Sequence, residues 1–199
     1  MAYEKTGVHA IALVNHFTPP QLEGCAKAEF ARAYIDAFHE FKRCAEARGI
    51  AAIFGIELRF QENLNDYLVF GIDEEDVYRI CDFVPLGLER FCREFKREGI
   101  VVIQAHPKRD RMIDMPMGLV DGWEAFNLHP NHNSRVGIAA RIAGAEGLIV
   151  TGGTDFHHPG HEGVCLLRSR RTVKDSHELA ALLLGRDYVL DIGGSIVLP

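Results

Sequence analysis

Short apolar runs that alternate with helical stretches constrain the fold of this chain more than any other feature of its sequence. Six runs predict buried strands, at residues 9–15, 51–56, 67–70, 100–105, 119–126 and 148–150. Five helices are predicted between or after them, at residues 23–48, 74–83, 86–98, 132–146 and 176–184. The runs rarely alternate between apolar and polar residues, so both faces of the sheet are expected to be covered. This pattern is typical of a parallel α/β protein.

The two ends of the chain carry shorter elements. Residues 2–6 are polar and predict the end of a helix that stops at Gly7, and residues 188–192 and 195–198 predict two further strands. A chain of 199 residues without an internal repeat or a linker rich in Pro, Gly and Ser is expected to form one domain over residues 1–199.

Charge and cysteine content limit the classes of function. A formal net charge of −6 and a pI near 5.9 argue against a protein that binds duplex nucleic acid, which normally carries a basic face. Five scattered cysteines without a CxxC motif fit reduced thiols in a cytoplasmic protein better than a disulfide framework. No signal peptide or transmembrane run is visible in the sequence, so no membrane partner is expected.

Histidines and carboxylates stand where four of the predicted strands end. These residues are His16, Glu57, His106 and the pair Asp155 and His157. In parallel α/β folds the carboxyl ends of the strands form the functional face, so these side chains are expected to converge. A single histidine at a strand end is more often satisfied by a neighbouring carbonyl group than by a metal. Four successive strand ends of this kind favour a metal site.

The same residue types suit a hydrolytic metal centre. Imidazole and carboxylate ligands at about 2.0–2.2 Å fit zinc, manganese or iron. A bridging carboxylate can hold two ions about 3.5–4 Å apart, with a hydroxide nucleophile and a substrate oxygen between them. Glu57 is central in the order of the strands and is the natural bridge. Such a site is expected to hydrolyse a phosphate ester.

Five motifs resemble, in order and spacing, those of the PHP (polymerase and histidinol phosphatase) family. They are Val-Asn-His at 14–16, Gly-Ile-Glu at 55–57, Gln-Ala-His-Pro at 104–107, Trp-Glu-Ala-Phe-Asn at 123–127 and Gly-Gly-Thr-Asp-Phe-His at 152–157. The resemblance extends from about residue 7 to residue 164. It implies a distorted (β/α)7-type barrel, two or three divalent metals at the strand ends, and phosphoesterase activity on a small phosphorylated metabolite.

The resemblance also assigns roles to single residues. His16 and His157 look like ligands of one metal, and Glu57 looks like the bridge between two others. His106 and Asp155 each look like a ligand of one of the bridged ions, so Glu57, His106 and Asp155 form the expected centre of catalysis. Asp66 stands where many family members carry a histidine and is a further expected metal ligand. Its alternative is an ordinary turn aspartate after Asn65.

The chain also departs from the family pattern. The family opens with a strand that carries His-x-His and a further histidine downstream, and this sequence has no such segment. Asn15 also stands where the family usually has an aspartate before His16. The barrel is therefore expected to be incomplete, lacking its first β/α unit. A second copy of the chain, another partner, or residues 1–8 or 186–199 are expected to cover the open edge, because unpaired strand edges are unfavourable.

Basic residues and further histidines lie in loops near the same face. Arg109 and Arg135 suit a substrate phosphate, although basic loop residues are more often simply solvated. Four loop histidines are expected to be exposed, with a role as an acid or an additional ligand as the alternative: His129, His132, His158 and His161.

Three functions compete on this basis. The first is a metal-dependent phosphoesterase acting on a small metabolite, and the second is a metal-binding or structural domain that has lost turnover. The absent His-x-His strand favours the second. A nuclease is disfavoured by the acidic charge and by the lack of a basic stripe.

Overall fold

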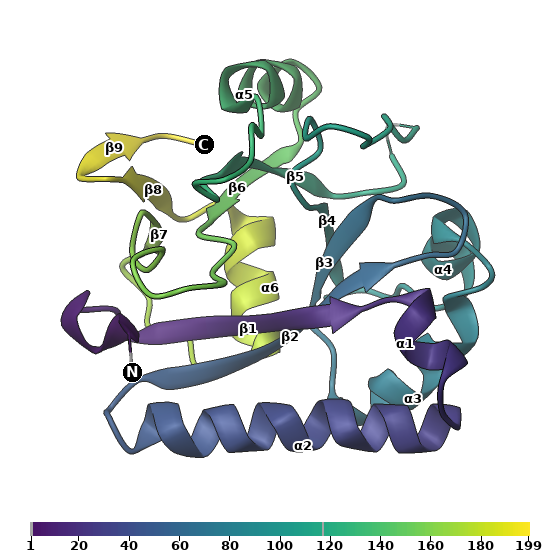
Figure 1. Cartoon of the computed structure of the whole chain (residues 1–199). Coiled ribbons are helices and arrows are strands. Elements are labelled where there is room, and N and C mark those ends of the chain that lie inside the picture. Colours follow the sequence, from purple (N-terminus) through teal and green to yellow (C-terminus); the bar gives the residue numbers. More distant parts are fainter. Residues whose placement is uncertain (1, 117) are drawn as a thin grey trace.

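A curved six-stranded sheet dominates the computed structural model, which describes residues 2–116 and 118–199 (Figure 1). Its strands follow one another in chain order: β1 (Ala10–Phe17), β2 (Ala51–Arg59), β3 (Asp66–Phe70), β4 (Val101–Gln104), β5 (Gly122–Asn127) and β6 (Ile149–Gly153). The fold is mixed α/β, and the sheet forms an open half-barrel. Within the described residues, β1 and β6 each pair with one strand of this sheet.

The prediction of a parallel sheet is wrong for β3. In a fully parallel sheet all five neighbouring strand pairs would be parallel. Here β3 runs antiparallel to both β2 and β4, while β1–β2, β4–β5 and β5–β6 are parallel. The connection from Arg59 to Asp66 is the physical reason. A parallel crossover needs about a dozen residues or more, and this connection is shorter, so the chain must return as a hairpin.

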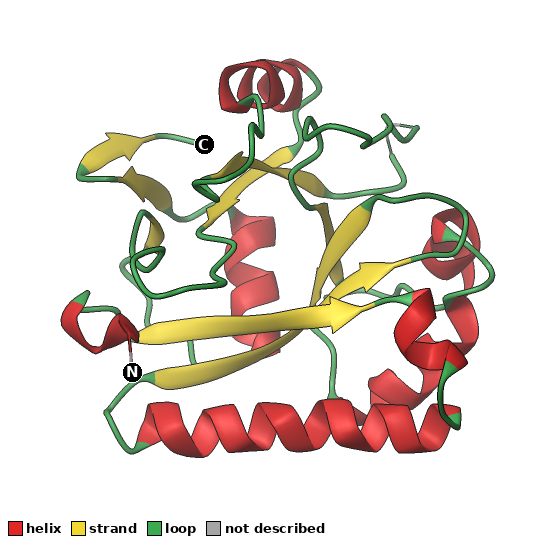
Figure 2. Cartoon of the chain, in the orientation of Figure 1, coloured by secondary structure: helices red, strands yellow, loops and turns green. Residues whose placement is uncertain are grey.

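The described residues form six α-helices. These helices lie around the strands, as Figure 2 shows in the orientation of Figure 1. They are α1 (Pro19–Glu23), α2 (Lys27–Glu46), α3 (Glu74–Phe83), α4 (Leu88–Glu94), α5 (Val136–Ala145) and α6 (Ser176–Gly185). The predicted helix at 23–48 is thus shorter, with the separate helix α1 before it. Helix α4 begins only at Leu88, because Gly87 has a φ of +87° and the Leu88 amide donates to Glu62 Oε1 at 3.0 Å. Helix α5 begins only after Arg135, which has a left-handed backbone.

Helix α2 fixes the strands that carry the first part of the site. Its buried face includes Tyr34 and Phe38, and the Phe38 ring meets the Phe54 ring of β2 edge-on at 4.9 Å. Burial of each such aromatic side chain contributes roughly 2–3 kcal/mol. The Tyr34 hydroxyl also donates to the carbonyl of Asn15 at 2.7 Å. This contact holds the end of β1, directly before His16, against the helix.

A second, antiparallel sheet contains the end of the chain. It consists of β7 (Cys165–Arg168), β8 (Val189–Ile192) and β9 (Ser195–Val197), of which β7 was not predicted. Residues 186–199 therefore do not add a strand to β1. Residues 2–5 form a 3-10 helix, η1 (Ala2–Lys5), in which the Tyr3 hydroxyl lies 2.6 Å from Thr154 Oγ1. The N-terminal segment thus connects to the loop after β6 by side-chain contacts.

The five cysteines, all among the described residues, are free. Cys81 and Cys165 are buried, whereas Cys44 is exposed, so packing explains only some of them. None of the helices in residues 2–116 and 118–199 has the length and apolar character needed to cross a membrane.

Candidate metal centre

One edge of the six-stranded sheet collects the predicted ligands. His16 and Glu57 lie near the carboxyl ends of β1 and β2 and are register partners across this parallel pair. Asp66 is the first residue of β3 and pairs in register with Arg59 near the end of β2. Because β3 runs antiparallel to its neighbours, its amino end lies at the same edge as their carboxyl ends. His106 lies two residues after the end of β4 at Gln104.

A pocket of about 240 Å³ opens at this edge. All six predicted metal ligands line it, together with one of the two predicted phosphate ligands, Arg109. The lining residues are His16, Glu57, Arg59, Asp66, His106, Arg109, His129, Asn131, His132, Asp155, His157 and His158. The structure therefore brings together predicted ligands that lie up to 141 positions apart in the sequence, from His16 to His157.

Glu57, Asp66 and His106 form the buried floor of the pocket. His106 Nε2 lies 3.4 Å from Glu57 Oε1 and 3.6 Å from Asp66 Oδ2. One ligand atom from each residue lies within 4.8 Å of the others, close enough to hold a single metal ion. The exposed fraction of the side chain is 4% for His106, 11% for Glu57 and 3% for Asp66. Two carboxylates and an imidazole suit zinc, manganese or iron.

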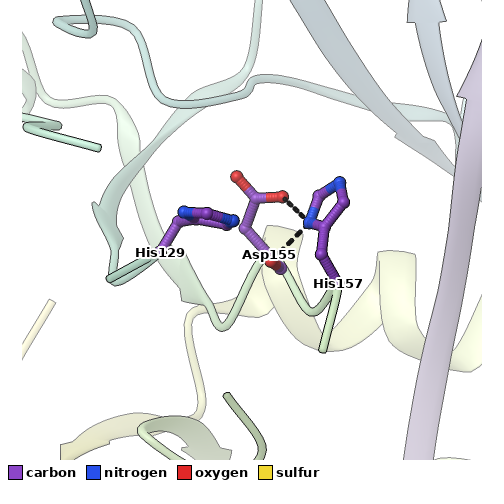
Figure 3. A group of neighbouring side chains, drawn as sticks. All are labelled: His129, Asp155 and His157. Atoms are coloured by element: carbon purple, nitrogen blue, oxygen red, sulfur yellow. Dashed lines mark hydrogen bonds and ion pairs between the residues drawn. The ribbon is translucent and has the colours of Figure 1, made fainter. Parts of the chain in front are cut away.

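A second group, shown in Figure 3, consists of His129, Asp155 and His157. Its ligand atoms also lie within 4.8 Å of one another, and the Asp155 carboxylate stands between the two imidazoles. His157 Nδ1 lies 3.3 Å from Asp155 Oδ1 and donates to the Asp155 carbonyl at 2.9 Å. In the neutral ring this leaves Nε2 of His157 with a free lone pair, as a metal ligand requires.

The backbone that brings Asp155 and His157 together is not the extended strand that their spacing suggests. Extended geometry would point residues two apart to the same side, but both residues lie in the loop after β6, and Asp155 has a left-handed φ of +49°. A non-glycine residue in this region is strained by about 1 kcal/mol or more. His106 is similarly strained, with a φ of +32°. Such outliers occur preferentially at functional sites.

His16 lies between the two groups. Its Nδ1 is 3.4 Å from Glu57 Oε2, and its ring centroid is 6.2 Å from that of His157. The His16 and His157 side chains are about half exposed, at 48% and 47%. The pocket therefore has a buried floor of carboxylates and His106, and a solvent-facing rim of histidines.

Two arginines pair with the aspartates of the pocket. Arg59 binds Asp66 through both Nε and Nη2, at 2.8 and 2.7 Å, and so occupies both carboxylate oxygens. Arg109 Nη2 lies 2.6 Å from Asp155 Oδ2. A metal bound to either aspartate must therefore compete with, or share the carboxylate with, a guanidinium group.

Arg135 lies elsewhere and does not line the pocket. Its guanidinium donates to the Lys108 carbonyl at 2.6 Å and to Asp110 Oδ1 at 2.5 Å. Of the two predicted phosphate ligands, only Arg109 is therefore positioned beside the candidate metal ligands.

Asn127 and Glu124 connect the two groups from beneath. Glu124 Oε2 accepts from the His106 backbone amide at 3.2 Å and from Asn127 Nδ2 at 2.9 Å. The same Asn127 amide group lies 3.2 Å from Asp155 Oδ2. Its oxygen accepts from Arg109 Nη2 at 2.8 Å and from the His129 amide at 3.2 Å. Asn127 thus contacts the second group directly, and Glu124 links it to the backbone of His106 in the first group.

Gly153 makes room for this network. A Cβ atom at Gly153 would lie 2.5 Å from Glu124 Oε1, so any larger residue would displace that carboxylate. Gly152 and Gly153 belong to β6 itself, and neither has a positive φ. Their role is therefore close packing of the strand against neighbouring side chains.

Burial and charge set the protonation of the site. Burial raises the pKa of Glu124 to about 7, despite the opposing charge of His106. Burial lowers the pKa of His106, but its hydrogen bond to Glu57 and the Glu124 charge outweigh this, so the pKa is raised overall. Burial alone would raise the pKa of Asp155, but the hydrogen bond and the charge of Arg109 outweigh burial. The pKa is lowered overall, so this carboxylate stays ionised. Burial lowers the pKa of His129, which favours the neutral ring that metals bind.

Several residues of the site are not evident from the sequence. The sequence predicts that His129 is an exposed loop histidine, but in the structure it is buried, with 7% of its surface exposed. The available signal was its position just after the strand that ends in Asn127. Arg59 has a signal as well, because it follows Glu57 by two residues and projects to the same side of the strand. The contact between Glu124 and His106 depends on sheet order, which no local pattern reveals.

No family model matches the sequence, and no curated protein does at a significant level. Among solved structures, the crystal structure of a proposed metal-dependent phosphoesterase from Bifidobacterium adolescentis is similar, with 14% sequence identity and a TM-score of 0.49. The alignment covers 92% of this chain and 87% of that one. At this identity and TM-score the similarity is too weak to assign a fold family or an activity.

Proposed function

We propose that this chain is a PHP-type metal-dependent phosphoesterase that hydrolyses the phosphate ester of a small metabolite. One observation carries the proposal. All six ligands expected from the sequence line one pocket, and they come from five separate segments of the chain. Structural histidines and aspartates would have no reason to converge in this way at one sheet edge.

The residues present fit divalent metals. Glu57, Asp66 and His106 would hold one ion, and His129, Asp155 and His157 would hold a second, with His16 beside both. His106 Nδ1 is buried and has no hydrogen-bond partner within the described residues. No contact of this atom with those residues therefore fixes which ring nitrogen of His106 is free to bind a metal. His129 Nδ1 accepts from the Asn131 amide at 3.2 Å, so coordination through Nε2 requires the ring proton to move and that contact to break.

When bound, such ions supply Lewis acidity toward a phosphoryl oxygen and acidify a coordinated water. The side chains of the protein supply position and charge. Glu57 lies between His16 and His106, within 3.4 Å of each, and orients both imidazoles. Arg109 presents a guanidinium group at the pocket wall, where it can bind the phosphate of the substrate. Zinc, manganese and iron all remain compatible with this ligand set.

The proposal is tested by metal-dependent hydrolysis. The purified protein is stripped of metal, reloaded separately with Mn²⁺, Zn²⁺ or Fe²⁺, and assayed with phenyl phosphate. Turnover is expected with at least one metal. Glu57→Gln is expected to reduce kcat by at least a hundredfold, because it removes the charge of a proposed metal ligand that also orients both neighbouring imidazoles. Glu98→Gln, at an exposed position outside the pocket, is the matched control. Absence of turnover with all three metals would reject the proposal.

A second candidate function is a metal-binding domain without turnover. The pairing of Asp66 with Arg59 and of Asp155 with Arg109 favours it, because both carboxylates already have a cationic partner. This candidate predicts bound metal in the wild-type protein together with no hydrolysis. The same assay, combined with metal analysis, therefore separates the two functions.

A further inference from the structure

A second pocket, of about 380 Å³, adjoins the candidate metal centre. It shares Arg59, Arg109, Asn131 and His132 with the first pocket, so the two are continuous. The remaining lining residues are Leu64, Asp110, Arg111, Met112 and Asn133. A phosphate held over the metal ligands would therefore have its ester group directed toward this space or toward solvent.

The charges around the second pocket leave one unbalanced cation. Arg59 is paired with Asp66, and Arg109 is paired with Asp155. Asp110, the acidic residue of the lining, is paired with Arg135 at 2.5 Å. No carboxylate in residues 2–116 and 118–199 pairs with Arg111. Arg135 thus neutralises Asp110 and leaves the second pocket positive.

The loop that carries Arg111 is fixed to the buried part of the site. Asn65, which is fully buried and precedes Asp66, accepts from the Ile113 amide at 2.9 Å and donates to the Ile113 carbonyl at 2.8 Å. The Met112 amide donates to the Arg109 carbonyl at 3.1 Å. Arg111 itself has a left-handed φ of +72°, a conformation that is strained for a residue other than glycine. The Arg111 side chain is exposed, so the anchored loop presents its guanidinium group to a ligand in the second pocket.

We propose that the second pocket binds the leaving group of the substrate and that this leaving group carries a second anionic group, held by Arg111. The inference rests on the proposed phosphoesterase function and names the class of its substrate. Leu64 and Met112 supply apolar surface for the carbon skeleton, and Arg111 supplies a planar fork for a carboxylate or a further phosphate. Esters with an uncharged leaving group leave the positive charge of Arg111 unmatched.

A matched pair of substrates tests this inference. Phenyl phosphate and 4-carboxyphenyl phosphate differ only in one carboxylate, far from the bond that breaks. The wild-type enzyme is expected to show a KM roughly tenfold lower for the carboxylated ester, the effect of one charge-assisted hydrogen bond. Arg111→Gln is expected to bring the ratio of the two KM values to about one, and Arg111→Lys to retain part of it. Arg170→Gln, an exposed arginine outside both pockets, should keep the wild-type ratio.

The two proposals fail in different ways. If neither ester is hydrolysed, the phosphoesterase function fails, and the pocket is then tested by calorimetric titration of the two esters into the metal-loaded protein. A preference for the carboxylated ester that Arg111→Gln abolishes supports Arg111 as the anion-binding residue of the second pocket in either experiment. Equal KM or equal affinity for the two esters in the wild-type protein overturns it, as does a preference that survives in Arg111→Gln.

Discussion

Arg109 Nη2 lies 2.6 Å from Asp155 Oδ2, and both side chains are largely buried, at 16% and 11% exposure. This ion pair occupies one oxygen of a carboxylate that the proposed function assigns to a metal. Metal binding and the Arg109 contact are therefore expected to influence each other. A bound ion at Asp155 replaces part of the charge compensation that Arg109 provides in the metal-free protein.

Replacement of Arg109 by glutamine should lower the free energy of unfolding of the metal-free protein and increase the stabilisation that added metal provides. The change leaves the Asp155 carboxylate buried and without its cation, so the free energy of unfolding should fall by about 2 kcal/mol. Added Mn²⁺ should restore more stability to the variant than to the wild type. Urea unfolding with and without Mn²⁺ measures both effects. Arg135→Gln, which breaks a more exposed pair, should cost under about 1 kcal/mol. An equal metal response in all three proteins would contradict the prediction.

Replacement of Asn127 by aspartate tests its role as the link between Glu124 and the second ligand group. The change preserves shape and acceptors but removes the donor to Glu124 and Asp155, which lie 2.9 and 3.2 Å away. Three carboxyl groups would then meet in a buried region, so metal-free Asn127→Asp should lose about 2–4 kcal/mol of unfolding free energy at pH 8. Asn133→Asp, at an exposed position, is the matched control. Wild-type stability in Asn127→Asp would show that its amide donor has no structural role.

Glu124 predicts a specific pH dependence of stability in the metal-free protein. Its pKa is raised to about 7 by burial, above the ordinary value of 4.5. A raised folded-state pKa contributes stability that is fully present below the unfolded-state pKa and is lost as the pH rises through about 7. Glu124→Gln keeps the acceptor oxygen and does not ionise.

Between pH 4.5 and pH 8, the variant should therefore gain on the order of 3 kcal/mol of unfolding free energy relative to the wild type. Urea unfolding of both proteins across this range gives the difference. A constant difference at every pH would mean that Glu124 does not titrate between these limits.

Two glycine substitutions should change stability in opposite directions. Gly153→Ala places a Cβ atom 2.5 Å from Glu124 Oε1 and should cost about 1–3 kcal/mol. Gly144→Ala, within α5, meets nothing within 4 Å and should stabilise by about 0.5–1 kcal/mol. Thermal unfolding of both variants and of the wild-type protein measures the two changes in stability. Destabilisation by both, or by neither, would be inconsistent with the packing described around Glu124.

The sequence predicted the strand ends of the site well because each is a local pattern. An apolar run followed by His16, Glu57 or His106 is visible without knowledge of the fold, and all three line the pocket. Asp66 joins them only because β3 is antiparallel, a direction that the short connection after Arg59 indicates but strand patterning alone does not. Asp155 and His157 are brought together by a left-handed backbone that the sequence does not reveal.

The supporting contacts depend on which strands become neighbours, and this explains why they could not be predicted. Asn127 meets Asp155 because β5 pairs with β6, and Glu124 reaches the His106 amide because β4 pairs with β5. The pairing of Arg109 with Asp155 likewise joins residues that lie 46 positions apart. Local periodicity carries no information about such contacts, and they set the protonation and orientation of the candidate ligands.

Metal content measured by mass spectrometry tests the central claim most directly. The wild-type protein, dialysed against Mn²⁺ or Zn²⁺ and then against metal-free buffer, should retain at least one ion per chain. The double variant Glu57→Gln, His106→Gln should lose at least one ion relative to the wild type while remaining folded by circular dichroism. A wild-type protein without retained metal, or a folded double variant with unchanged metal content, would contradict the assignment of this pocket as a metal centre.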